Sequence, residues 1–310
     1  MKYIFISYIN RSGSTYLANQ ISKSSFCCVC PEADILFDIL LRHPLQKNRN
    51  KRIIKHILND PKIKMWKLDR DLLEKLLNEK LEGYKVFFNV LSLYREKENN
   101  KAVFILFKHN HINVIFNYLT EQQRKNVFHI TLLRNPANTY LSQKNTISPN
   151  TLNPMCKNPY TFCRQFNQFY CNVWQKQSPD TYRLIFEKLI NNLNNEMQEL
   201  LYFLGISDNF SDTASRIGSV YKSLNTEYRA VHNNIINPPD ITKSEDVWPK
   251  LIVYEQYLFS RYLTLTNNIY PVPDSQIKPV FNFRIRLLLN KIAHAVHVTR
   301  QKLHYFRLTI

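Results

Sequence analysis

Glycine, acidic residues and long apolar runs are all scarce in this sequence. Only 4 of the 310 residues are glycine and 14 are proline, which excludes collagen-like and other low-complexity chains. No apolar run approaches the roughly 20 residues that a transmembrane helix needs. The opening run ends at Asn10 and Arg11 with no small-residue cleavage site after it, so we expect a strand there rather than a secretion signal. At 44% hydrophobic and 13% aromatic, the chain is expected to fold around a large core.

The shortage of acidic residues makes the protein strongly basic. Forty-two Lys and Arg residues against 24 Asp and Glu residues give a net charge of +18. A field of this sign attracts nucleic acid, anionic lipid or anionic substrates without choosing among them. Residues 42–56 and 275–310 contain no acid at all.

The second acid-free stretch has a helical pattern. Apolar residues recur there at helical spacing: Ile285, Leu288, Leu289, Ile292 and Val296. We therefore expect a basic amphipathic helix, and divide the chain into a domain over 1–270 and a helical extension over 271–310. Three interpretations stay open for both basic stretches: a solvated surface, a contact with an anionic acceptor, or a contact with an anionic membrane.

The six cysteines are expected to be reduced thiols, because no secretion signal precedes them. Cys27, Cys28 and Cys30 are clustered, but no second pair of ligands follows at a spacing that zinc sites use. No metal is therefore expected.

Short apolar, β-rich runs alternate with amphipathic segments along the first two-thirds of the chain. Runs without polar alternation are typical of central parallel strands, and the alternation with helices predicts an α/β fold. The expected strands are residues 3–9, 84–90, 103–108, 127–133 and 182–186, and the expected helices are 70–81, 159–177 and 187–204. Thr120 to Gln123 has the pattern of a helix capping box.

The first motif is the loop Asn10-Arg-Ser-Gly-Ser-Thr15, which connects the first strand to a helix. A small-residue loop at a helix N-terminus presents backbone N–H groups and the positive end of the helix dipole to an anion. Gly13 allows close approach of the backbone, and Arg11 adds a permanent cation. Ser12, Ser14 and Thr15 add hydroxyl donors, and Tyr16 follows them. The loop lacks the first glycine and the lysine of a Walker A motif, which disfavours hydrolysis of ATP or GTP.

The second motif follows the strand expected at 127–133. Arg134 stands at the carboxyl end of that strand, Pro136 at the first position of a helix, and Ser142 two turns later. This spacing allows Arg134 and Ser142 to reach one phosphate above the strand ends, where α/β sheets bind ligands.

Together the two motifs resemble those of the PAPS-dependent sulfotransferases, which use 3′-phosphoadenosine 5′-phosphosulfate as donor and release 3′,5′-adenosine bisphosphate. The resemblance implies a three-layer P-loop-like fold with a central parallel sheet. It also implies that residues Arg11 to Thr15 hold the 5′-phosphosulfate, with Arg11 stabilising the leaving group, and that Arg134 and Ser142 hold the 3′-phosphate.

A third segment agrees with the same family and extends the resemblance to residues 3–206. The stretch Tyr182 to Leu189 and the later Phe203-Leu-Gly-Ile206 resemble the family's "YEDL … FLGI" segment. This sequence departs from that pattern at two positions, where Phe186 replaces the Tyr and Lys188 the Asp.

The resemblance also suggests candidates for the catalytic base. Glu32, which follows Pro31, matches the glutamate after the first helix in carbohydrate and tyrosylprotein sulfotransferases. His109 and His111 are the alternative, since they follow a strand as the catalytic histidine of small-molecule sulfotransferases does. Lys108 is a further residue expected to face the donor. Lys85 resembles the lysine of a "GxK" strand.

Weaker candidates for the donor site come later in the chain. Lys222 and Arg229 lie where the family often has a loop over the 3′-phosphate and adenine.

The expected activity is transfer of a sulfuryl group to a hydroxyl acceptor, a carbohydrate or glycolipid in the first place, with a peptide tyrosine or small molecule as the alternative. The expected location is cytoplasmic, with possible peripheral contact at an anionic membrane, and no specific nucleic acid is expected as partner. A P-loop kinase and a non-enzymatic basic binder of nucleic acid or membrane remain as rivals.

Overall fold

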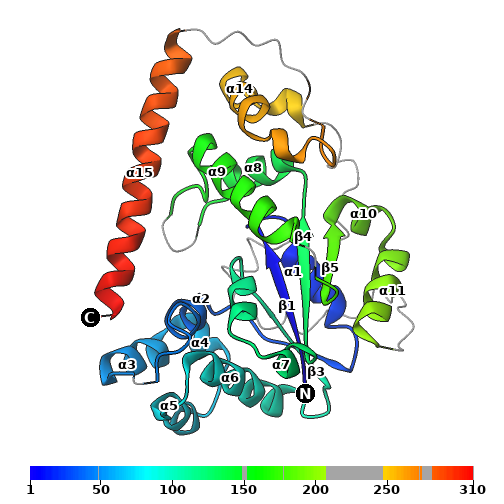
Figure 1. Cartoon of the computed structure of the whole chain (residues 1–310), viewed down its shortest axis with the longest axis vertical. Coiled ribbons are helices and arrows are strands. Elements are labelled where there is room, and N and C mark those ends of the chain that lie inside the picture. Colours follow the sequence, from blue (N-terminus) through cyan, green and yellow to red (C-terminus); the bar gives the residue numbers. More distant parts are fainter. Residues whose placement is uncertain are drawn as a thin grey trace. The chain divides into compact units, whose positions relative to one another are not determined.

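The computed structural model describes residues 1–47, 49–148, 152–176, 178–206, 247–271, 273 and 281–309 (Figure 1). The chain divides into two compact units. The first, called here the sheet unit, comprises residues 1–8, 13–132 and 178–239. The second, called the helical unit, comprises residues 9–12, 133–177 and 240–310. The predicted donor-site residues Lys222 and Arg229 lie outside the described residues.

A five-stranded sheet in the order β2-β3-β1-β4-β5 forms the centre of the sheet unit. The strands are β1 (Lys2–Tyr8), β2 (Cys27–Val29), β3 (Phe104–Lys108), β4 (Val127–Leu133) and β5 (Thr181–Ile185). The ladders that join β2 to β3, β3 to β1, and β1 to β4 are all parallel. The predicted α/β class with a central parallel sheet is confirmed. Parallel strands place their carboxyl ends at one edge of a sheet, which is where α/β proteins bind ligands.

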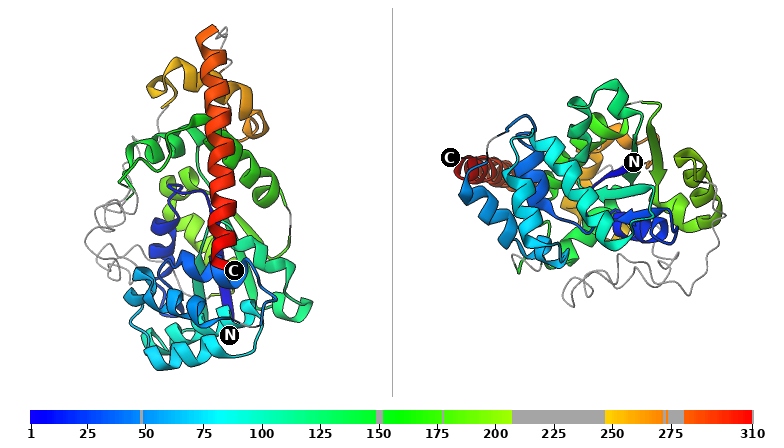
Figure 2. Two further views of the ribbon diagram at one scale, coloured as in Figure 1. Left: turned by 90° about the vertical axis from the view of Figure 1, so that its left-hand side faces the viewer. Right: turned by 90° about the horizontal axis from the view of Figure 1, so that it is seen from below.

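Helices cover both faces of this sheet. Side chains alternate along each strand, so Phe5 and Phe107 pack into one core while Ile4 and Leu106 pack into the other. The first face is covered by α2 (Asp34–Leu36), α3 (Lys51–Asn59), α4 (Pro61–Met65), α5 (Arg70–Asn78) and α6 (Gly83–Glu98), with the π-helical turn η1 (Phe37–Leu41) and the 3-10 turn η2 (Ile112–Asn117). The second face is covered by α1 (Ser14–Ile21), α10 (Phe186–Asn191) and α11 (Leu193–Leu204). Figure 2 shows α3, α5 and α6 gathered together. The result is three layers.

The helical unit is built from α8 (Pro136–Asn145), α9 (Pro159–Phe169), α14 (Val253–Tyr262) and α15 (Phe281–Thr309), with the turns η3 (Tyr170–Trp174), η6 (Trp248–Lys250) and η7 (Thr264–Thr266). Its core contains a buried carboxylate. Glu255 accepts hydrogen bonds at 2.7 Å from both the Tyr140 hydroxyl and Lys144 Nζ, which ties α8 to α14. Pairing of this kind is what permits a carboxylate to be buried.

The prediction of a strand over 84–90 is wrong. These residues begin α6, whose buried side chains recur every three or four residues, at Tyr84, Phe87, Val90 and Tyr94 among others. A run in which five of seven residues are apolar does not distinguish a buried strand from the start of a buried helix. The three-residue edge strand β2 was not predicted, whereas the capping box predicted at Thr120 is present and begins the short helix α7 (Glu121–Arg124).

The predicted helices are confirmed with two refinements, of which the first is that the segment expected over 187–204 is divided at Asn192 into α10 and α11. Over 159–177 the expected apolar face is buried, but the last turn, Tyr170–Trp174, is π-helical rather than α-helical. The helix expected to end near Gly205 does so, because Gly205 adopts a left-handed φ of 70° at the C-cap of α11. The Asp69 side chain caps α5, because it accepts a hydrogen bond from Leu72 N at 2.9 Å.

Part of the basic stretch at 42–56 has a structural role. Residues 51–56 belong to α3, and Arg49 donates hydrogen bonds to the carbonyl oxygens of Leu77, Glu79 and Leu81. The Arg49 side chain therefore caps the C-terminal end of α5, where a cation is favourable.

All six cysteines are free thiols, and only Cys171 is exposed. In the described part of the chain, no helix combines the length and the apolarity needed to cross a bilayer.

Candidate active site

The loop after β1 begins in a tight turn. Ser12 N donates to the Ile9 carbonyl oxygen at 3.0 Å, and Arg11, at the middle of the turn, has a φ of 70°. Left-handed backbone is unfavourable for a residue with a Cβ, and such strain is concentrated at functional sites. The turn buries Ser12, which is 1% exposed, and its hydroxyl oxygen has no hydrogen-bond partner among the described residues. A buried hydroxyl in this state has the capacity to bind a ligand oxygen.

Gly13 joins this turn to α1. Its φ is 91°, and a Cβ at this position would collide with the ring of Phe186. Gly13 is also the N-cap of α1, and in the part of the chain that the structure describes no side chain caps the helix there. The amides of the first turn, from Ser14 onward, are thus oriented as a helix N-terminus presents them to an anion. The Phe186 ring meets Tyr16 edge-on, with 6.3 Å between centroids.

Two arginines and a serine meet in the helical unit. Arg11 Nε donates to Ser142 Oγ at 3.1 Å, and Arg134 Nη1 donates to the Arg11 carbonyl oxygen at 2.9 Å. The pKa of Arg11 is lowered by burial and by the nearby charge of Arg134. Two guanidinium groups held this close repel each other, so an anion bound to both would relieve an existing electrostatic cost.

Local sequence explains how Arg134 and Ser142 reach this position. β4 ends at Leu133, and the Asn135 side chain caps α8 by accepting hydrogen bonds from Ala137 N at 2.9 Å and Asn138 N at 3.2 Å. Pro136 occupies the first turn of α8, as predicted. Arg134 therefore stands at the strand end and Ser142 two turns into α8.

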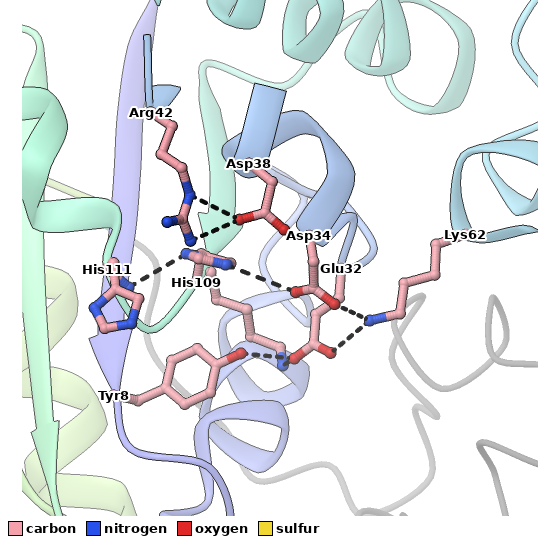
Figure 3. Close-up of polar contacts among 9 residues, drawn as sticks. Tyr8, Glu32, Asp34, Asp38, Arg42, Lys62, His109 and His111 are labelled. Atoms are coloured by element: carbon pink, nitrogen blue, oxygen red, sulfur yellow. Dashed lines mark hydrogen bonds and ion pairs between the residues drawn. The ribbon is translucent and has the colours of Figure 1, made fainter. Parts of the chain in front are cut away.

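A second polar cluster lies in the sheet unit, at the carboxyl ends of β1 and β3 (Figure 3). Lys108, the last residue of β3, is 3% exposed, and its Nζ donates to Thr15 Oγ1 at 3.0 Å and forms an ion pair with Glu32. The Tyr8 hydroxyl, at the end of β1, donates to Glu32 Oε1 at 2.8 Å. The N-terminal turn of α1, a buried lysine and a carboxylate are therefore brought together.

Cations hold Glu32 in its ionised form. Burial alone would raise the pKa of Glu32, but the ammonium groups of Lys108 and Lys62, with hydrogen bonds from Lys108 and Tyr8, hold the pKa well below its usual range. Burial and the same carboxylate raise the pKa of Tyr8 well above its ordinary value, so Tyr8 stays a donor. Glu32 is thus a carboxylate at every physiological pH.

Lys62 extends the cluster toward solvent. Its Nζ lies 2.6 Å from Asp34 Oδ2 and 3.9 Å from Glu32 Oε2. Figure 3 shows Tyr8 and Lys62 approaching Glu32 from opposite sides.

The two histidines have different surroundings. His109 is nearly buried and stacks on Phe37, with 4.0 Å between ring centroids, and His111 is exposed. Burial lowers the pKa of His109 to about 4. Its Nδ1 accepts a hydrogen bond from His111 N at 3.2 Å, so the proton of the neutral ring is on Nε2, which lies 3.7 Å from Asp34 Oδ1. The lone pair that a base would use is therefore occupied.

The fold of the sheet and its helices is similar to that of the sulfotransferase domain from the curacin biosynthetic pathway. The TM-score is 0.50 and the sequence identity 17%, over 84% of this chain and 96% of that domain. The chain has the fold of a sulfotransferase. The three-layer architecture implied by the sequence resemblance is confirmed at the level of the fold.

Two further sulfotransferase structures give lower TM-scores. The sulfotransferase domain of the Synechococcus PCC 7002 olefin synthase gives a TM-score of 0.43 at 14% identity, over 78% of this chain and 91% of that domain. Mouse sulfotransferase SULT7A1, crystallised with PAP, gives a TM-score of 0.44 at 12% sequence identity, over 87% of this chain and 86% of that one. No protein-family model and no curated protein sequence matches the chain.

On this sulfotransferase fold, the candidates divide between two clusters. Arg11, Arg134 and Ser142 meet in the helical unit, and Thr15, Lys108 and Glu32 meet in the sheet unit. The interpretation of Lys85 as a strand residue is wrong, because Lys85 lies on α6 and pairs with Glu82 at 2.9 Å. No group of His, Cys, Asp and Glu side chains suited to a metal occurs in the described ranges.

Tyr8, Lys62 and Asp34 are the members of the second cluster that sequence reasoning did not find. Tyr8 carried a signal, since it ends a strand beside the loop. Lys62 and Asp34 carried none, because only the path of α2 to α4 brings them next to Glu32.

Proposed function

We propose that the protein is a PAPS-dependent sulfotransferase. The observation that carries the proposal is the arginine cluster: Arg11 and Arg134, two like charges, are held together with Ser142. This cluster stands on the loop that runs directly into the uncapped N-terminus of α1. The arginine cluster and the N-terminus of α1 are two separate features that each suit an anion, and the donor PAPS carries two separate phosphate groups. The sulfotransferase fold supports the same assignment.

The donor is bound by groups that exist before it arrives. Arg134 and Ser142 bind the 3′-phosphate, and the amides and hydroxyls of Gly13 to Thr15 bind the 5′-phosphosulfate. The buried Ser12 hydroxyl, which has no partner within the described ranges, and the close approach allowed at Gly13 both fit a bound oxyanion. Preorganised donors of this kind stabilise charge that develops on the leaving phosphate.

The reaction transfers one sulfuryl group. The acceptor oxygen forms a bond to sulfur while the bond from sulfur to the 5′-phosphate oxygen breaks, and the electron pair of that bond stays on the phosphate. The acceptor proton passes to the base. Lys108 Nζ lies 3.0 Å from Thr15 Oγ1, in the loop proposed to bind the phosphosulfate. Its ammonium charge can therefore balance negative charge on the transferring sulfuryl group.

Glu32 is the base that the geometry favours. It is ionised at neutral pH and lies beside Lys108, whereas the Nδ1 lone pair of His109 already accepts the His111 amide. Lys108 makes Glu32 a weak base as long as the two are paired. A sulfonate bound at the N-terminus of α1 competes for Lys108, which restores the basicity of Glu32 when the donor is present.

The acceptor is a hydroxyl compound, and a carbohydrate or glycolipid is proposed first because Glu32 resembles the base of carbohydrate sulfotransferases. The strongly basic surface suits an acceptor that carries negative charge.

The test is release of 3′,5′-adenosine bisphosphate from PAPS in the presence of a panel of glycans, glycolipids, tyrosyl peptides and phenols. We expect turnover with at least one glycan or glycolipid, a loss of 10²-fold or more in Glu32→Gln, and less than tenfold in His109→Gln. Binding of the bisphosphate to both variants is the control for folding. A loss in His109→Gln alone would transfer the role of base to His109. Turnover with ATP and magnesium instead of PAPS would contradict the proposal as a whole.

A further inference from the structure

Helix α15 has one face that packs on the rest of the helical unit. The half-buried residues of this contact face recur at helical spacing: Phe283, Leu287, Asn290, His294 and Val298. Asn290 Nδ2 donates to the Tyr254 hydroxyl at 2.8 Å, and Asn158 Nδ2 donates to the Asn290 carbonyl oxygen at 2.9 Å. The contact face therefore has fixed partners on α14 and on the N-cap of α9. Figures 1 and 2 draw α15 as one uninterrupted helix.

The opposite face of α15 is apolar and open to solvent. Its members, called here the outer stripe, are Ile285, Leu289, Ile292, Val296 and Leu303, each 45–59% exposed. At about 100° per residue, the stripe is centred about 180° from the contact face. Packing within the helical unit therefore does not explain why these five positions are large aliphatic residues.

Cations lie on both sides of α15, between the outer stripe and the contact face. By helical register, Arg284 and Lys291 fall on one side, and Arg286 and Arg300 on the other. Arg286 lies over the Tyr254 ring at 4.6 Å and Lys291 over the Tyr160 ring at 6.0 Å, so Arg284 and Arg300 are the cations tested below. No acid occurs from residue 275 to residue 310. Two copies of α15 placed stripe to stripe would bring these flanks together as like charges, which disfavours a second copy as the occupant.

We propose that the outer stripe is a docking surface for an anionic lipid bilayer. A long helix with aliphatic residues on one side and cations along both edges lies flat in the headgroup region, with its stripe among the acyl chains and its cations at the lipid phosphates. With 29 residues, α15 is about 43 Å long, enough for the whole stripe to engage one surface. This inference is independent of the proposed sulfuryl transfer.

The experiment is co-sedimentation of the full-length protein with large unilamellar vesicles of phosphatidylcholine, with and without 30% phosphatidylserine. We expect binding that requires phosphatidylserine and weakens roughly fivefold for each cation removed, in Arg284→Gln and in Arg300→Gln. Replacing two stripe residues, in Leu289→Ser/Ile292→Ser, is expected to weaken binding by about 30-fold or more. The matched control is Leu72→Ser/Leu265→Ser, which removes two leucines, 52% and 48% exposed, from outside α15 and leaves binding unchanged.

Three results would overturn the proposal. The first is equal binding to vesicles with and without phosphatidylserine. The second is unchanged vesicle binding in the stripe variant while the arginine variants lose it, which would indicate a general polyanion site. The third is self-association through the stripe, seen in sedimentation velocity and abolished by Leu289→Ser/Ile292→Ser. Stabilisation by 3′,5′-adenosine bisphosphate in the same variants reports on the donor site separately. Either proposal can therefore be contradicted while the other stands.

Discussion

Buried Lys108 and half-buried Glu32 form an ion pair at the carboxyl edge of the sheet, and Lys108 also donates to Thr15 in the first turn of α1. One ammonium group is thus shared between the proposed base and the proposed donor-binding loop. Occupation of the loop and basicity of the carboxylate are linked through this lysine, because its charge determines where the Glu32 proton equilibrium lies.

Removing the charge of Lys108 is expected to change the pH profile of activity. In Lys108→Met, burial becomes the main influence on Glu32 and raises its pKa, so the acidic limb of kcat/KM moves to higher pH. In the wild type the same limb lies below the usual range of a glutamate. Lys108→Arg keeps the charge and is the matched control, with its limb close to that of the wild type. Superimposable profiles for Lys108→Met and wild type would show that Lys108 does not control the base.

Alanine substitutions at Gly13 and Gly205 separate the cost of backbone strain from the cost of a steric collision. Both have positive φ, but a Cβ on Gly13 meets the Phe186 ring, while a Cβ on Gly205 meets nothing within 4 Å. We expect Gly205→Ala to lower the free energy of unfolding by about 1 kcal/mol and Gly13→Ala by about 3 kcal/mol, measured by urea denaturation. The double variant Gly13→Ala/Phe186→Ala should lose less than the sum of its single variants. Equal losses for the two alanine variants would argue against the collision.

His129 is expected to make the protein sensitive to acid. It is 6% exposed, lies with Nε2 2.8 Å from Ser7 Oγ, and burial lowers its pKa to about 4 from an ordinary value of 6.5. Between these two pH values the imidazole of His129 binds a proton in the unfolded chain but not in the folded chain. The free energy of unfolding therefore keeps its full His129 contribution above pH 6.5 and falls as the pH approaches 4. The loss is about 3 kcal/mol. In His129→Gln the urea-unfolding free energy should fall less over this interval than in the wild type, and parallel curves would contradict the account.

The sequence predicts the architecture well because its signals are local. The strands around Phe5, Phe107 and Leu132 each show an apolar run, and the Asn135–Pro136 cap shows where α8 begins. The residues 84–90 mislead for the same reason: an apolar run is local, but the choice between strand and helix depends on the residues that follow.

The site is predictable only in part. Arg11, Arg134 and Ser142 stand at fixed distances from strand ends, so the topology of an α/β sheet brings them together. The environment of Glu32 depends on Lys62 and Asp34, which approach it through the folded path of several short helices. The Nδ1 lone pair of His109 is occupied by the backbone amide of His111, and no pattern of residues in the sequence predicts that hydrogen bond.

The most direct test of the account is thermal stabilisation by 3′,5′-adenosine bisphosphate, compared with ATP and magnesium. At 100 times Kd, bound ligand adds about 2.7 kcal/mol, or roughly 5 °C for a chain of this size. The account predicts this shift for the bisphosphate in wild type and in the control Arg164→Ala, on the exposed side of α9, and its loss in Arg134→Ala. No shift in wild type, or an equal shift in Arg134→Ala, would contradict the assignment of Arg134 to the donor.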